Sequence, residues 1–192
     1  MRLLLIAAFL TLALSACSTS PSSKYYFLSA EPIAAAPAKA NDVRIVVGPI
    51  TVPALNDRPQ LISQTGKNEV QINEYHRWAG SLNSNISRII TANIAQDLGA
   101  PNVWSFSQST PTKYDYQVFI DVQTLESKPG DEVIVDALWT IKSTKAGHNE
   151  PTVGRTLVHE SVAGEGFNAL VAAQSRAFAK VSKDIALSGA LR

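Results

Sequence analysis

Few side chains in this sequence are of the types that most often carry out chemistry. It contains one cysteine, Cys17, and three histidines, His76, His148 and His159. The histidines lack a close spacing such as H-x-x-x-H, which favours zinc, and no G-x-S-x-G segment supplies a serine nucleophile. We expect His148 in a solvated loop and His159 on one face of a strand. The sequence therefore predicts no catalytic residue, no metal and no cofactor.

Two acidic residues are a further candidate for catalysis. Asp121 and Asp136 could lie diagonally across a hairpin that turns at Pro129 and Gly130. A pair of carboxylates supplies the acid and the base in glycosidases. The polar face of an antiparallel sheet also commonly carries acids with solvated or cationic neighbours. We favour this second interpretation, in which neither carboxylate is catalytic.

A glycine motif resembles a dinucleotide site. The segment 164–169, GEGFNA, matches G-x-G-x-x-A between an expected strand and an expected helix. A nucleotide site needs a second strand and an acid that binds the ribose, and the sequence ends about two dozen residues after the motif. We therefore interpret these glycines as a turn into the last helix.

A charged and aromatic cluster, residues 74–78 (EYHRW), precedes a clear helical pattern. Trp78 is in phase with a stripe of apolar residues, and Gly99 with Pro101 gives a stop signal. We expect Trp78 to be buried in the first turn of this helix. His76 and Arg77 are then exposed at its start, where they are candidates for binding a partner protein. The apolar residues that share the stripe with Trp78 are Leu82, Ile86, Ile89, Ile90, Ile94 and Leu98.

The pattern of strands and helices that the sequence predicts around these residues indicates an α+β fold. A strand is expected in residues 24–30, another with a bend at Gly48 and Pro49, and a short pair around 61–64 and 69–72. Alternating segments at 114–126, 132–144 and 155–165 predict an antiparallel meander. A final amphipathic helix follows from Phe167. The predicted architecture is a two-layer domain, in which two amphipathic helices pack on a mainly antiparallel sheet.

The first residues predict an exported lipoprotein. The apolar run from Leu3 to Leu14 is too short to cross a bilayer comfortably and is typical of a signal peptide. Residues 14–17, LSAC, resemble a bacterial lipobox, which implies cleavage before Cys17 and acylation of Cys17. Because Ser18 and not Asp follows, the resemblance implies the periplasmic face of the outer membrane. We expect a signal peptide at 1–16, a lipidated tether at 17–23 and one domain at 24–192.

The charge of the expected mature chain argues against nucleic acid as a partner. The formal net charge of the sequence is +1. Removing the signal peptide also removes Arg2, so the balance falls to about zero. A neutral chain offers no basic face for nucleic acid or for anionic membranes.

Several segments together resemble the ABC-type transport auxiliary lipoproteins of the PqiC/YmbA type. After the lipobox, Tyr25–Leu28 resembles the YYxL strand of that family. The segment 43–62 is loosely similar to its VxVxxVxVPxxLxRxQL pattern, with two residues, ND, where the family more often has one. The segments 74–82 and 116–126 resemble its Trp element and its YxVxVxVxxxE strand.

This resemblance implies a non-enzymatic role. Proteins of the family accompany MCE-domain proteins, which bridge the periplasm and carry lipids between membranes together with a permease. The chain is then a docking element on the outer membrane, and a homo-oligomer would match the symmetric rings of MCE proteins. The alternatives are a lipid-anchored periplasmic hydrolase, which needs a nucleophile or metal set, and a stand-alone lipid carrier, which needs an apolar cavity.

Overall fold

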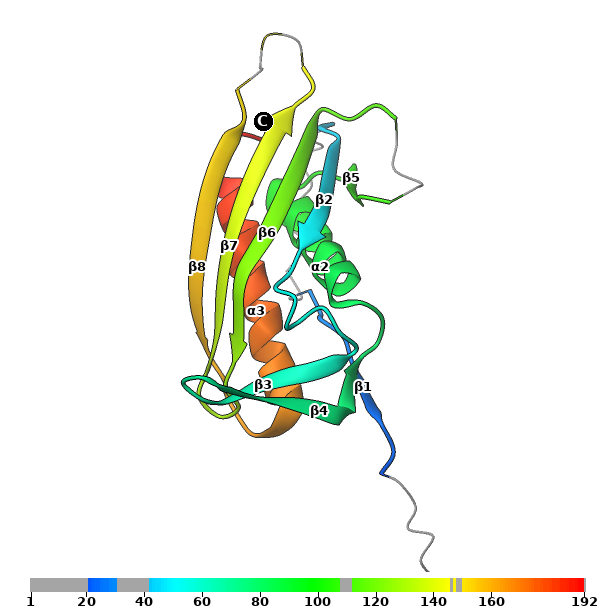
Figure 1. The fold of residues 1–192 in the computed structure, drawn as a ribbon. Coiled ribbons are helices and arrows are strands. Elements are labelled where there is room, and N and C mark those ends of the chain that lie inside the picture. The colour runs from blue at the N-terminus through cyan, green and yellow to red at the C-terminus, as the bar shows by residue number, and fades with distance from the viewer. Residues whose placement is uncertain (1–20, 31–41, 108–111, 146, 148–149, 192) are drawn as a thin grey trace, which may run out of the picture.

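The computed structural model describes residues 21–30, 42–107, 112–145, 147 and 150–191. These residues form a larger sheet, a smaller sheet and two helices (Figure 1). In chain order the elements are β1 (Lys24–Tyr26), β2 (Ile45–Thr51), β3 (Gln60–Gly66), β4 (Glu69–Trp78), α2 (Leu82–Leu98), β5 (Val103–Ser105), β6 (Tyr116–Ser127), β7 (Glu132–Ser143), β8 (Thr152–Ser161) and α3 (Gly166–Leu187).

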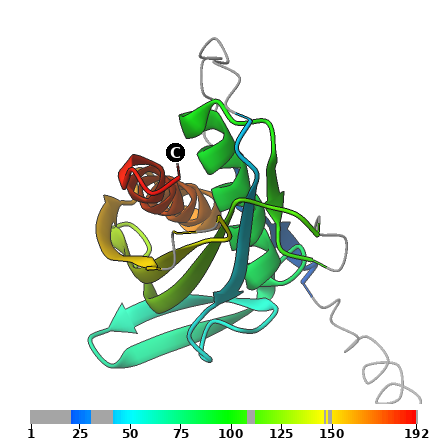
Figure 2. The same ribbon diagram turned by 90° about the horizontal axis from the view of Figure 1, so that it is seen from above.

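The larger sheet has five strands in the order β5-β2-β6-β7-β8. The strands β6, β7 and β8 form the predicted antiparallel meander, while β2 lies parallel to both β5 and β6. The register of β2 against β6 shifts between Val47 and Ile50, at the predicted bend. Both helices pack side by side against one face of this sheet (Figures 1 and 2). The predicted α+β class, with two helices on a sheet, is confirmed.

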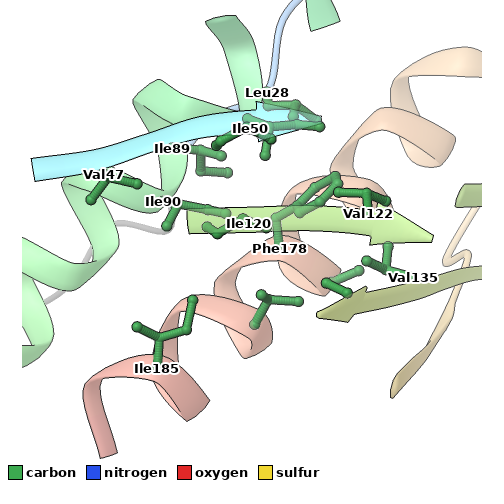
Figure 3. Packing of buried hydrophobic residues seen from close by; sticks show 14 of the residues in the cluster. Leu28, Val47, Ile50, Ile89, Ile90, Ile120, Val122, Val135, Phe178 and Ile185 are labelled. Atoms are coloured by element: carbon green, nitrogen blue, oxygen red, sulfur yellow. The ribbon is translucent and has the colours of Figure 1, made fainter. Parts of the chain in front are cut away.

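The alternation of apolar residues explains why this sheet holds the helices. Val118, Ile120 and Val122 of β6 face the helices and are each no more than 2% exposed. The stripes of α2 and α3 meet them, so that isoleucines of α2 and Phe178 of α3 fill the interior (Figure 3). Burial of these side chains is the main favourable contribution to folding.

The boundaries of α2 follow from capping. Ser81 is the N-cap, and its hydroxyl accepts a hydrogen bond of 3.2 Å from the backbone N–H of Ser84. Gly99 ends the helix in the left-handed conformation, with φ of 60°, as the stop signal predicted. Gly80, with φ of 104°, lies just before the cap. The helix therefore starts four residues later than the sequence predicted.

The smaller sheet has three strands in the order β1-β4-β3 and lies across one end of the long strands (Figure 1). Its strand β4 contains the whole cluster 74–78, so the prediction that this cluster begins a helix is wrong. Trp78 is buried as predicted, at 5% exposure, but from the end of a strand. The strand β1 pairs with β4 in parallel, a long-range pairing that no local pattern in the sequence indicates.

Candidate functional site

The residues that follow β1 are fastened to both helices. The backbone N–H of Leu28 donates to the Asn85 side chain of α2 at 3.3 Å, and its carbonyl accepts from Arg88. One residue on, the N–H of Ser29 donates to Ser175 Oγ of α3 at 3.2 Å. Leu28 itself is fully buried. The domain therefore holds its first residues in a fixed position, next to the expected tether.

His76 is the centre of an aromatic cluster that joins three elements. Its Nδ1 lies 2.7 Å from the hydroxyl of Tyr26 in β1. Its ring stacks on Phe167 of α3, with a centroid distance of 3.8 Å. Burial, and then the charge of Lys24, lower the pKa of His76 below its usual range. The imidazole contacts both β1 and α3, so His76 is half-buried and less exposed than the sequence predicted.

Arg77, the second residue of the predicted partner-binding pair, is partly exposed. Its guanidinium lies 3.9 Å from the carboxylate of Glu74 and 3.4 Å from the Glu74 carbonyl, and its side chain is 30% exposed. In the register of β1 and β4, Arg77 lies opposite Tyr25. The side chain of the next residue, Trp78, packs in the core, and its backbone N–H donates to the Pro59 carbonyl at 2.7 Å.

Two exposed aromatic rings lie beside this cluster. Tyr25 is 65% exposed and Phe27 is 58% exposed. The guanidinium of Arg88 lies 5.8 Å from the centroid of the Phe27 ring, within reach of a cation–π interaction. We call Lys24, Tyr25, Phe27 and Arg88 the N-terminal surface. Next to it, a groove of about 360 Å³ opens toward α3, lined by Tyr25, Phe27, Ala30, Asn168, Val171 and Ala172.

The carboxylates considered for catalysis have separate structural partners. Asp136 accepts two hydrogen bonds from Arg155, at 2.8 and 2.5 Å, and the hydrogen bonds from this guanidinium lower the pKa of Asp136. Asp121 accepts hydrogen bonds from Thr51 and Gln123. An acid held ionised by an arginine is unsuited to donating a proton. This arrangement agrees with the structural interpretation.

The remaining candidates from the sequence have similar explanations. His159 lies on β8, as predicted, with its Nδ1 at 2.9 Å from Glu132. The glycine motif forms the turn into α3, which begins at Gly166. Glu160 receives hydrogen bonds from Arg176 and Lys180, each at 2.6 Å. Burial by itself raises the pKa of Glu160, but these hydrogen bonds outweigh it and the net pKa is lowered.

Two of the predicted residues, Cys17 and His148, lie outside the described residues. Within the described part of the chain, no three His, Cys, Asp or Glu side chains gather where they could hold a metal ion. No helix in that same part combines the length and the apolar character needed to cross a membrane.

The sequence does not indicate the long-range contacts that hold the N-terminal surface in place. The sequence predicts a strand at YYFL, but no local signal separates the packed Tyr26 from its exposed neighbours. The contact between His76 and Phe167 joins β4 with the last helix, and no spacing in the sequence indicates it. The aromatic richness of 25–27 was the one available signal, because large rings at consecutive positions of a strand cannot all point inward.

Comparisons with known proteins extend these observations. A family model described as an ABC-type transport auxiliary lipoprotein component matches residues 26–186. No functionally curated protein shows significant similarity to the sequence. The structure is similar to the crystal structure of an uncharacterized protein, with a TM-score of 0.69 and 17% identity over 87% of this chain and 98% of the other.

A second similar structure is that of a Xanthomonas campestris protein of the DUF330 family. Its TM-score is 0.65 and its identity 15%, over 84% of this chain and 92% of the other. At such identities the two structures support the fold alone.

Proposed function

The chain belongs to the ABC-type transport auxiliary lipoprotein family, and from this premise we propose that it is an outer-membrane-anchored, non-enzymatic docking component of an MCE-type lipid transport system. The observation that carries the proposal is the family match over residues 26–186, which spans both sheets and both helices. A lipobox-like segment, 14–17, lies a short distance before that match.

The proposed division of the chain is a signal peptide at 1–16, a tether at 17–23 and a domain at 24–192. Acylated Cys17 is the anchor, because a cysteine follows the LSA segment at the position that the lipobox requires. Three acyl chains together give stable anchoring, whereas a single chain binds membranes only marginally. Ser18, in place of Asp, favours the outer membrane.

The anchor is tested by replacing the cysteine. Cys17→Ser is expected to abolish labelling with a radioactive fatty acid and to prevent cleavage by the lipoprotein signal peptidase. For the wild type, we expect density-gradient fractionation to place the protein with outer-membrane markers. Ser18→Asp is expected to move it toward the inner membrane. Labelling that persists in the Cys17→Ser variant would refute the anchor.

The proposed partners are an MCE-domain protein and, through it, a membrane permease. A partner that crosses the periplasm must meet the anchored domain on an exposed surface, and Arg77 remains our candidate residue on that surface. Arginine is enriched among residues that dominate binding energies. His76 contributes by holding β4 against Phe167. A homo-oligomer that matches the symmetry of an MCE ring completes the proposal.

Docking is tested by pull-down of an MCE-domain protein from the same organism, the partner class named in the proposal. Arg77→Ala is expected to weaken binding without changing the melting temperature. Arg155→Ala is a matched control, because Arg155 also pairs with a carboxylate but lies on β8 of the other sheet. Equal binding by wild type and Arg77→Ala would remove Arg77 from the interface. Turnover of an ester, glycoside or phosphate by the wild type would contradict the non-enzymatic role.

A further inference from the structure

The two exposed rings of the N-terminal surface are held in place by the backbone around them. The carbonyl of Tyr26, which lies between them, accepts a hydrogen bond of 2.7 Å from Ala79. Leu28 and Ser29 are bonded to both helices, as described above. The exposure of Tyr25 and Phe27 is therefore a property of the folded domain and not of a loose chain end. Placing such rings in water is unfavourable unless another surface covers them.

The surroundings of these rings are cationic. Arg88 lies over the ring of Phe27, and Arg77 is opposite Tyr25 at the border of the surface. Lys24 begins the same strand on its other face, opposite His76, and its long side chain ends at the same edge. Tyrosine and other amphipathic aromatic side chains are favoured at the boundary between the acyl chains and the headgroups of a bilayer. Lysine and arginine beside them interact with the headgroup phosphates. The surface therefore combines the residue types that bind the interface of a phospholipid membrane.

The position of this surface in the chain favours the same occupant. Lys24 follows Cys17 by seven residues, which span at most about 25 Å when fully extended. If Cys17 is acylated, β1 is held within this distance of the membrane at all times. Such tethering makes even a weak contact effective, because the local concentration of lipid is high. Val70, Ile72 and Tyr75 of β4 are also exposed, by 42–44%, but less than Tyr25 and Phe27, whereas the exposed Val153 and Leu157 of β8 belong to the larger sheet.

We propose that Tyr25 and Phe27 insert into the interface of the phospholipid membrane that holds the anchor, with Lys24 and Arg88 on its phosphates. The inference rests on the anchor of the proposed function and adds a second contact to it. Two contacts fix an orientation where a lipidated tether alone leaves the domain free to rotate. The N-terminal surface then faces the lipid, and Arg77, on the neighbouring strand β4, lies at its border, where the partner can reach it.

The test uses the lipidated full chain, reconstituted into liposomes of phosphatidylethanolamine and phosphatidylglycerol whose acyl chains are brominated near the headgroup. Phe27→Trp places an indole in the N-terminal surface. Leu157→Trp is the matched control, since Leu157 is 60% exposed and lies on β8. We expect bromine to quench the emission added by Phe27→Trp and to leave that added by Leu157→Trp unchanged, with the native tryptophans subtracted as the parent signal.

The outcomes separate this inference from the anchor. Protein that floats with the liposomes but shows no quenching for Phe27→Trp, or equal quenching for both variants, would overturn the membrane contact and leave the anchor intact. Protein that does not float would overturn the anchor and this inference together. If the liposomes do not quench Phe27→Trp, and its emission spectrum shifts only when the MCE protein is added, the surface binds that partner and not the membrane. Tyr25→Ser combined with Phe27→Trp is expected to weaken the quenching.

Discussion

The two sheets of this domain are stabilised by different interactions. Along β6 of the larger sheet, every second residue from Tyr116 to Val122 is buried against the helices. Along β4 of the smaller sheet, residues 69–72 are all exposed, and only Asn73 and Trp78 are buried. Apolar burial in this sheet is limited to Leu61, Ile62 and Trp78. Specific contacts add to it: the Asn73 amide donates to the Leu61 carbonyl and to Ser63, both at 3.0 Å. Hydrophobic burial thus dominates one sheet, and polar and aromatic contacts the other.

This difference has a consequence for dynamics and for function. Regions with few buried apolar contacts open at lower free energy than the core. The smaller sheet carries the N-terminal surface and Arg77, so the part that we propose to meet membrane and partner is also the part with less apolar burial. We expect the larger sheet and the helices to determine global stability and the smaller sheet to open locally.

The largest expected difference comes from removing one apolar side chain in each region. Phe178→Ala, in α3, is expected to lower the free energy of unfolding by about 3–5 kcal/mol, because its ring is fully buried. Ile72→Ala, in β4, is expected to lower it by no more than about 1 kcal/mol. Urea unfolding of the mature chain measures both. Equal losses would contradict the assignment of global stability to the larger sheet.

A second comparison uses glycines, one in each sheet. A Cβ built on Gly154 of β8 would lie 2.1 Å from the Trp139 ring, whose Nε1 is fixed by a hydrogen bond of 3.1 Å to Thr156. We expect Gly154→Ala to cost about 1–3 kcal/mol through overpacking. Gly66→Ala in β3 meets only ordinary contacts of 3.6 Å, so about 0.5 kcal/mol or less is expected. Thermal melting that ranks the two variants the other way would refute this account of β8.

The sequence predicted the larger sheet well because burial of one face imposes alternation. Val133, Val135 and Ala137 are buried as their spacing indicated. It failed at residues 74–78, since the spacing of Trp78 from Leu82 and Ile86 fits a helix by coincidence. A better indication of where the helix begins is Ser81, an N-cap residue immediately after Gly80. The strand β1 pairs with residues about fifty positions away, and no local pattern encodes such a partner.

The candidate site was predictable only in part, for the same reason. Arg77 was found as an exposed cation, and it is partly exposed. The role of His76 depends on Tyr26 and Phe167, which come from the two ends of the domain. Composition identified these residues as aromatic, but only the fold brings them together.

A third prediction concerns the junction between the two regions, where β4 leads into α2. Ser81→Ala removes the side-chain acceptor from the helix N-terminus and is expected to cost about 1 kcal/mol. Ser81→Asp keeps an acceptor and is expected to retain most of the stability. The measurement is urea unfolding, together with amide exchange of the first turn of α2. If both substitutions cost the same, the loss does not come from capping.

The smallest expected effect is a difference in how the stability of the two sheets depends on pH. Carboxylates of the larger sheet, such as Asp136 and Glu160, have lowered pKa values, so their contribution to stability is lost only as the pH falls below about 4.5. The pKa of His76 is also lowered, but from the ordinary histidine value of about 6.5. Its contribution is therefore complete above that value and is lost as the pH falls through it, because the unfolded chain binds the proton more readily.

Between about pH 7 and pH 5.5, therefore, His76 weakens the smaller sheet while the carboxylates of the larger sheet do not yet respond. We expect the backbone amides of Trp78 and Ala79, which donate to Pro59 and Tyr26, to exchange faster relative to core amides as the pH falls through this window. His76→Phe keeps an aromatic ring beside Phe167 and removes the titrating group, so this extra acceleration should disappear in that variant. The other histidines are present in both proteins, and their effects cancel in the difference. Protection that instead grows on acidification would mean that the folded domain favours the charged imidazole, and the packed, neutral His76 on which the comparison of the two sheets depends would be wrong.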